Sequence, residues 1–177
     1  MAPPILIIPG HGDSGPGHWQ SLWEEALPSA RRVRMPNWDF PHLGDWVEAL
    51  DEAVREVTET APPILVAHSL GCLAVVHWAQ EDRLPIHAAL LVCPPDVETP
   101  ELRALFPSFA PIPLHGLPFE SRVVASSDDP FATLDRSRFF AEAWRSSFTD
   151  AGPKGHLNPA SGYGPWAQGE GLLEDLY

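Results

Sequence analysis

Hydrophobic positions along this chain fall into short continuous apolar runs separated by longer segments of helical spacing. The continuous runs are rich in aliphatic and β-branched residues, which is typical of strands buried on both faces of a sheet. They predict strands within residues 5–10, 64–68, 87–95 and 121–130, and two shorter, more polar segments, 31–36 and 145–152, are further strand candidates. The remaining periodic segments predict helices over residues 18–27, 44–59, 69–79, 135–144 and 164–177, with a short helical piece around 102–105.

Strands that alternate with helices indicate an α/β fold, a three-layer α/β/α sandwich around a mostly parallel sheet of about six strands. No repeat or linker divides the 177 residues, so we expect a single domain over residues 1–177. The proline-rich segment 94–119 is the one long stretch without predicted regular structure. Long loops in small domains are usually functional, and we expect this one to form a wall of a binding pocket.

Composition narrows the partners that this chain is expected to bind. With 24 acidic and 11 basic residues, the formal net charge is −13. Such a chain repels phosphate backbones and anionic lipids, so neither a nucleic-acid nor a membrane partner is expected. Residues 1–4 lack the basic region of a secretion signal, and no apolar stretch approaches the ~20 residues of a membrane span. We therefore expect a cytoplasmic protein in which Cys72 and Cys93, lacking CxxC spacing, are buried thiols.

The sequence AHSLG, residues 67–71, has the x-x-Ser-x-Gly layout of a nucleophile elbow between a strand and a helix. The strained turn requires small residues two positions before and two after the serine. Gly71 meets the second requirement, whereas Ala67 stands where glycine is most often found and adds one methyl group. The alternative interpretation is that Ser69 is an ordinary helix N-cap.

A serine hydroxyl needs a base to become a nucleophile, and the chain offers partners in the expected order. Asp128 and Asp129 lie in an acidic turn at the end of the predicted strand segment 121–130, and His156 lies in a loop after the last strand. The order Ser, Asp, His is the one expected of this fold. Taken singly, these residues also fit an acidic turn and a surface imidazole, but the coincidence of three placements favours a catalytic triad. Spacing alone does not separate Asp128 from Asp129.

The glycine-rich loop after the first strand, GHGDSGPG at residues 10–17, predicts an oxyanion hole. We expect the backbone N–H groups of His11 and Leu70 to stabilise the oxyanion. A phosphate-binding loop is the alternative, but the lysine of the GxxxxGK[ST] pattern is missing. Strand alternation points His68 away from Ser69, into a structural role. The other histidines lack metal-ligand spacing, so we expect no metal and no cofactor.

Four sequence segments together resemble a known family. PGHGDSGPGHWQSLWE, AHSLG, SSDDP and GHLNPASGYGPW are similar to the small α/β-hydrolase-fold serine hydrolases related to retinoblastoma-binding protein nine, and especially to bacterial, YdeN-like members. The resemblance spans nearly the whole chain and implies a minimal α/β-hydrolase fold without a large lid domain. It also implies Ser69 as nucleophile, Asp129, directly before a proline, as the triad acid, and His156 as the base.

The residues and the resemblance together predict a serine hydrolase that cleaves small-molecule esters or amides through an acyl-enzyme. Two alternatives stay open. The chain could be a hydrolase-fold protein-interaction module with vestigial activity, or an enzyme that uses the triad for lyase or acyltransferase chemistry. The sequence itself indicates no protein partner and no particular substrate.

Overall fold

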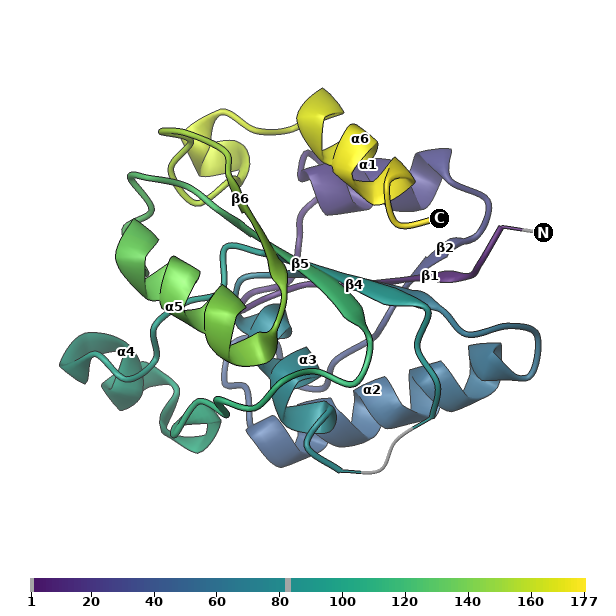
Figure 1. Cartoon of the computed structure of the whole chain (residues 1–177), viewed down its shortest axis with the longest axis horizontal. Coiled ribbons are helices and arrows are strands. Elements are labelled where there is room, and N and C mark those ends of the chain that lie inside the picture. Colours follow the sequence, from purple (N-terminus) through teal and green to yellow (C-terminus); the bar gives the residue numbers. More distant parts are fainter. Residues whose placement is uncertain (1, 82–83) are drawn as a thin grey trace.

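Parallel strands form a single six-stranded sheet in the computed structural model, which describes residues 2–81 and 84–177 (Figure 1). The strand order is β2-β1-β3-β4-β5-β6. Met1, at the start of the segment in which no secretion signal was expected, lies outside the described residues. The strands are β1 (Ile5–Ile8), β2 (Ala30–Arg32), β3 (Ile64–His68), β4 (Ala88–Val92), β5 (Glu120–Ala125) and β6 (Ser147–Asp150).

Helices connect successive strands, as the alternating pattern predicts. They are α1 (Trp19–Ala26), α2 (Leu43–Thr58), α3 (Leu70–Trp78), α4 (Pro100–Leu105), α5 (Leu134–Trp144) and α6 (Ala167–Glu174), with 3₁₀ turns η1 (Pro107–Phe109) and η2 (Pro159–Ser161). The clearest boundary difference is β2, which was predicted over residues 31–36 but ends at Arg32. This edge strand pairs only with β1, and Pro9 directly after β1 has no N–H to continue the ladder.

The two faces of the sheet are covered by different helices, so the predicted three-layer architecture is confirmed. Alternate strand residues enter two separate cores, as the two-residue period of a strand requires. One core holds Leu6, Leu65 and Leu91 together with side chains of α2, α3 and α5. The other holds Ile7, Val66 and Leu90 together with the tryptophans of α1 and the apolar side chains of α6. In Figure 1, α1 and α6 lie above the sheet and α2 and α3 below it.

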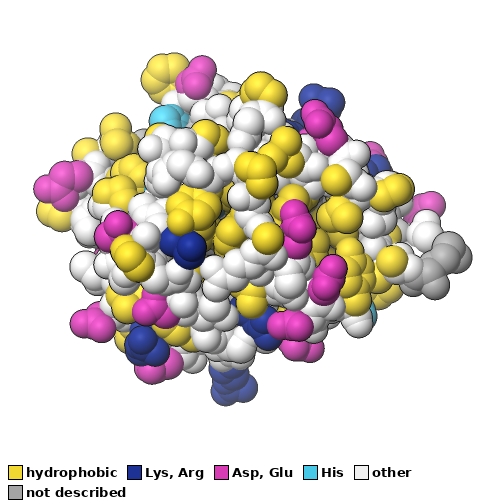
Figure 2. All heavy atoms as spheres, turned by 90° about the horizontal axis from the view of Figure 1, so that it is seen from above, with side chains coloured by type: hydrophobic (Ala, Val, Ile, Leu, Met, Phe, Trp, Pro, Cys, Tyr) yellow, Lys and Arg dark blue, Asp and Glu magenta, His cyan; other side chains and the backbone are white. Residues whose placement is uncertain are grey.

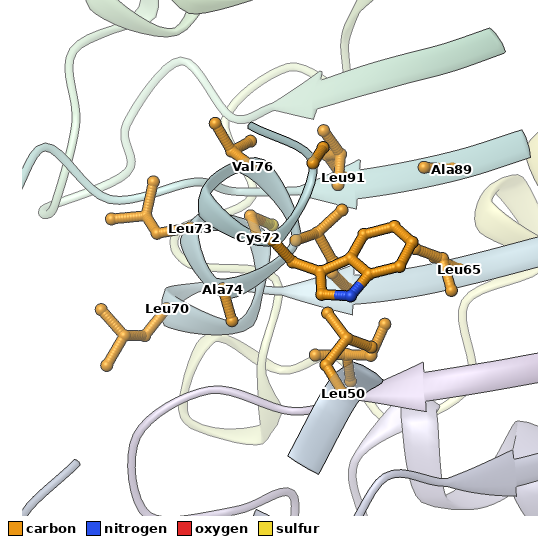
Figure 3. Close-up of a cluster of buried hydrophobic side chains, with 14 of the residues drawn as sticks. Leu50, Leu65, Leu70, Cys72, Leu73, Ala74, Val76, Ala89 and Leu91 are labelled. Atoms are coloured by element: carbon orange, nitrogen blue, oxygen red, sulfur yellow. The ribbon is translucent and has the colours of Figure 1, made fainter. Parts of the chain in front are cut away.

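Helix α3 is apolar on nearly all sides because it is enclosed on nearly all sides. Figure 3 shows it between the sheet, represented by Leu65, Ala89 and Leu91, and Leu50 of α2. Every residue of α3 except His77 is buried. A helix without a polar face is stable only in such a sandwich, so the core fixes where this helix begins.

Charged side chains are dispersed on one face of the molecule. On the face seen in Figure 2, acidic and basic side chains are scattered among apolar and uncharged ones. No helix among residues 2–81 and 84–177 is both long and apolar enough to cross a bilayer.

Candidate active site

Ser69 occupies a strained turn between the end of β3 and the start of α3. Its backbone has φ 55° and ψ −128°, in a region that a non-glycine residue rarely adopts. Its N–H donates to the carbonyl of Val92 on β4 at 2.9 Å. An ordinary N-cap serine has extended backbone and a side chain that accepts a helix N–H. Ser69 has neither feature, so the N-cap interpretation is wrong.

Glycine is required on both sides of this turn because backbones approach closely there. A Cβ placed on Gly71 would lie 2.4 Å from the carbonyl oxygen of Ile8, and one on Gly10 would lie 2.8 Å from Ser69 Cβ. Ala67, by contrast, is fully buried in the core on the α3 side of the sheet. Its additional methyl group is therefore accommodated by core packing and does not displace the elbow.

His156 links the serine to a carboxylate. Its Nε2 lies 2.8 Å from Ser69 Oγ, and its Nδ1 lies 2.9 Å and 3.0 Å from the two carboxylate oxygens of Asp129. The Asp129 side chain is 3% exposed, and His156 is 5% exposed. A serine hydroxyl, an imidazole and a carboxylate are thus brought together from the ends of β3, β6 and β5, in the geometry that nucleophilic catalysis requires.

The adjacent carboxylate, Asp128, faces the backbone of the histidine loop and not the imidazole. Its Oδ1 accepts hydrogen bonds from Gly155 N–H at 2.7 Å and from Ser126 Oγ at 2.8 Å. These bonds, led by the one from Gly155, lower the pKa of Asp128. The structure therefore distinguishes the two carboxylates, which sequence spacing alone could not do. Asp129 contacts the His156 imidazole, and Asp128 holds the loop that carries His156.

His68 and Trp19 support the same loop from the opposite side. His68 Nε2 donates to the carbonyl of His156 at 2.8 Å, and Trp19 Nε1 donates to that of Leu157 at 2.8 Å. Burial, followed by the nearby charge of His156, lowers the pKa of His68 well below its ordinary value. The His68 ring lies on the α1 side of the sheet, against His18 and Trp19. Its contact with the histidine loop, 88 positions further along the chain, leaves no signal in the sequence.

A pocket of about 260 Å³ opens over Ser69. The predicted wall, segment 94–119, supplies Pro95, Leu102, Leu105 and Phe106 to it. The other lining residues are His11, Ser69, Leu70, Phe131, His156 and Asn158. Sequence reasoning did not single out Phe131 or Asn158, although Asn158 lies in the segment GHLNPASGYGPW, because neither side chain was expected to take part in the chemistry.

His11 and Leu70, the predicted oxyanion-hole residues, both line this pocket. Leu70 is the first residue of α3, where backbone N–H groups have no acceptor within the helix. Within the described part of the chain, the N–H of neither residue has a hydrogen-bond acceptor. Both groups are therefore available to a ligand oxygen.

The loop after β1 also fits another motif, because Gly10, Gly12 and Gly15 have the G-x-G-x-x-G spacing of dinucleotide-binding loops. Its structure argues against that use. Gly10 packs against Ser69, and α1 begins only at Trp19. The Asp13 carboxylate occupies the loop, where it accepts hydrogen bonds from Ser14 N–H and from Arg32. A negative charge at that point disfavours a phosphate.

Among residues 2–81 and 84–177, one group of potential metal ligands has its donor atoms within 4.8 Å of one another: Cys93, Asp129 and His156. Asp129 and His156 already hydrogen-bond to each other. Burial, then the charge of Asp129, raises the pKa of the Cys93 thiol well above its ordinary value. This favours the protonated thiol over the thiolate that binds metals, so the group fits a triad better than a metal site.

Comparisons with known proteins indicate the family and the fold of this chain. A family model described as serine hydrolase matches residues 5–175. The "Putative hydrolase YdeN" of Bacillus subtilis is 32% identical over 88 residues, which is 48% of this chain and 45% of that protein, so the match spans less than half of this relative. A "putative YdeN-like hydrolase" from Pectobacterium atrosepticum superposes with a TM-score of 0.84 and 33% identity, covering 98% of this chain and 89% of the other. Esterase 2 of Thermogutta terrifontis, at 17% identity, shares the fold with a TM-score of 0.71 over 98% of this chain and 81% of its own.

Proposed function

The chain belongs to the serine hydrolase family, and from that premise we propose that it hydrolyses small esters or amides by way of an acyl group carried on Ser69. The observation that carries this proposal is the continuous contact from Ser69 Oγ through the His156 imidazole to Asp129. Each neighbour in that series has the distance that a hydroxyl nucleophile, a general base and an orienting carboxylate require.

The first half-reaction forms the acyl-enzyme. His156 Nε2 takes the proton of Ser69 Oγ as Oγ bonds to the substrate carbonyl carbon. The carbonyl oxygen becomes an oxyanion that accepts hydrogen bonds from the N–H groups of His11 and Leu70. The bond from carbon to the departing oxygen or nitrogen then breaks, and the proton passes from Nε2 to that leaving atom. Asp129 fixes the imidazole tautomer and stabilises the imidazolium between these transfers.

The second half-reaction returns the enzyme to its starting state. Water gives a proton to His156 Nε2 as its oxygen attacks the acyl carbon. The bond between Ser69 Oγ and that carbon breaks, the carboxylic acid departs, and the proton returns from Nε2 to Oγ. Esterases among the structural neighbours support ester hydrolysis as the first activity to assay.

A fluorophosphonate probe and a p-nitrophenyl ester test this proposal together. The wild-type chain should be labelled at Ser69 and should hydrolyse p-nitrophenyl acetate. Ser69→Ala should abolish labelling and lower kcat by roughly 10⁴-fold or more. Ser127→Ala is a matched control, because its exposed hydroxyl makes no hydrogen bond among the described residues. Near-normal turnover by Ser69→Ala, or an unlabelled wild-type protein, would refute the assignment.

A further inference from the structure

We propose that the departing group of the substrate is an uncharged apolar alcohol, and that it binds in a second hollow next to the pocket over Ser69. This inference rests on the proposed function and adds a substrate class to it. The second hollow has a volume of about 520 Å³ and lies between α4 and residues 129–133. Three of its side chains, Leu102, Leu105 and Phe131, also line the pocket over Ser69.

The shared side chains form a ridge between the two hollows that a substrate chain can cross. Leu105 is 66% exposed and Phe131 is 39% exposed, so both present apolar surface where the two hollows meet. Leu102, by contrast, is buried beneath them. An exposed apolar ridge joining two hollows gives a continuous surface for an apolar chain longer than the 260 Å³ pocket can hold.

The chemistry of the triad indicates which part of the substrate crosses this ridge. The leaving oxygen must come within hydrogen-bond distance of His156 Nε2 to receive its proton. The Phe131 ring lies edge-on to this imidazole, with ring centroids 4.6 Å apart. A chain attached to the leaving oxygen therefore meets Phe131 first and the second hollow next. The acyl group, whose oxygen faces the N–H groups of His11 and Leu70, stays in the smaller pocket.

The charges that line the hollows exclude an anionic leaving group. No lysine or arginine is among the side chains lining either hollow. The second hollow instead contains carboxylates, of which Asp96 is neutralised by Arg136 at 3.1 Å whereas Glu101 on α4 is exposed. A carboxylate or phosphate on the leaving group would approach Glu101 without a compensating cation. The site therefore fits an alkyl or aryl alcohol better than a leaving group that carries a phosphate.

Two isomeric esters test on which side the long chain binds. Hexyl acetate and ethyl hexanoate contain the same atoms but carry the long chain on the alcohol and on the acyl group, respectively. Release of acid is measured for both by titration at constant pH. A fully buried methylene is worth up to roughly fourfold. We therefore expect kcat/KM for hexyl acetate to exceed that for ethyl hexanoate by at least about tenfold. Equal values, or a preference for ethyl hexanoate, would overturn the proposal.

A third ester tests the charge argument. The compound 6-acetoxyhexanoate has the hexyl acetate chain with a terminal carboxylate, and we expect it to be hydrolysed at least about tenfold less efficiently. Glu101→Gln should narrow that gap, whereas the matched control Glu120→Gln, at the distant start of β5, should not. Equal hydrolysis of the charged and uncharged esters by the wild type would contradict the charge argument.

Substitution of the ridge completes the test. Leu105→Ser should lower the ratio of kcat/KM for hexyl acetate to that for methyl acetate. Leu114→Ser should leave this ratio unchanged, because Leu114 is also exposed but lies outside both hollows. Fluorophosphonate labelling of each variant reports whether the elbow is intact. Labelled, active protein without a chain-length preference overturns the second hollow alone, whereas an unlabelled wild type overturns the proposed function itself.

Discussion

Around Ser69, the backbones of β1, β3 and α3 pack so closely that a single Cβ on Gly71 would overlap the Ile8 carbonyl. Around His156, by contrast, the chain has no regular structure, and side chains from distant elements hold it by hydrogen bonds. Steric exclusion within one short stretch therefore fixes the position of Ser69, whereas a set of long-range polar contacts fixes that of His156. The two regions should respond differently to mutation and to pH.

The largest effect is expected at the carboxylate that joins the two regions. Asp129→Asn should lower kcat by about 10⁴-fold, because an amide does not stabilise the correct imidazole tautomer. Asp128→Asn provides the matched comparison, since its side chain holds the loop backbone without contacting the imidazole. Steady-state kinetics on p-nitrophenyl acetate distinguish the two variants, and an equal loss of kcat in both would contradict the assignment.

Acidification should weaken the side of the sheet that supports the histidine loop. Burial, then the charge of Arg32, lowers the pKa of His18 from 6.5 to about 4. The unfolded chain therefore binds this proton at a higher pH than the folded chain does. The free energy of unfolding should be greatest above pH 6.5 and should fall by about 3 kcal/mol as the pH approaches 4. The buried imidazole of His68 shifts in the same direction and adds to this loss.

Urea denaturation across this pH range measures the effect. His18→Asn is an informative variant, because its amide oxygen can accept the Gln20 N–H that His18 now accepts, yet it does not titrate. Its stability should depend less on pH than that of the wild type. The same pH dependence in both proteins would show that another group is responsible.

On the nucleophile side, Gly71→Ala should destabilise the fold by about 1–3 kcal/mol, because a carbonyl oxygen that cannot rotate away faces the new methyl group. Gly171→Ala, in open space on α6, should be neutral or slightly stabilising. Thermal denaturation of the two variants checks the difference. A stable Gly71→Ala would mean that β1 can move away from the elbow.

Around His156, removal of one hydrogen-bond donor should lower kcat more than it changes KM. In His68→Ala, the His156 carbonyl loses its donor, and we expect kcat to fall by roughly tenfold with little change in KM. His77→Ala is a matched control, since His77 likewise donates to a carbonyl, that of Phe109 at 2.9 Å, away from the site. The rate of fluorophosphonate labelling should fall only in His68→Ala. An equal decrease in the labelling rate of both variants would mean that His68 only stabilises the fold and does not position His156.

The same contrast explains what the sequence predicted. The elbow and its helix were predicted closely, because strand β3, small residues and a wholly apolar helix are neighbours in sequence. The edge strand β2 was placed less well, since its end depends on where its partner β1 stops. Helices α4 and α5 begin at threonine caps, a local signal, but nothing local shows that Leu105 would border a pocket.

The candidate site follows this division. The proximity of Ser69 and His156 was inferred from the order of motifs, whereas the choice between Asp128 and Asp129 came from family resemblance. The supporting contacts of His68 and Trp19 depend on residues far apart in the chain, which a single sequence does not pair. Gly10 lay in a recognised loop, but its requirement for glycine arises only from the approach of Ser69.

The enclosure of α3 has a consequence for how this protein opens. Because the sheet and α2 cover most of that helix, the amides beyond its first turn can exchange with solvent only when this core unfolds. The amides around His156 can be released by breaking a few hydrogen bonds. Hydrogen exchange should therefore be slowest in α3 and much faster in residues 152–158. Mild denaturant would disengage the base first and leave the serine in an intact elbow, still in place but without the group that activates it.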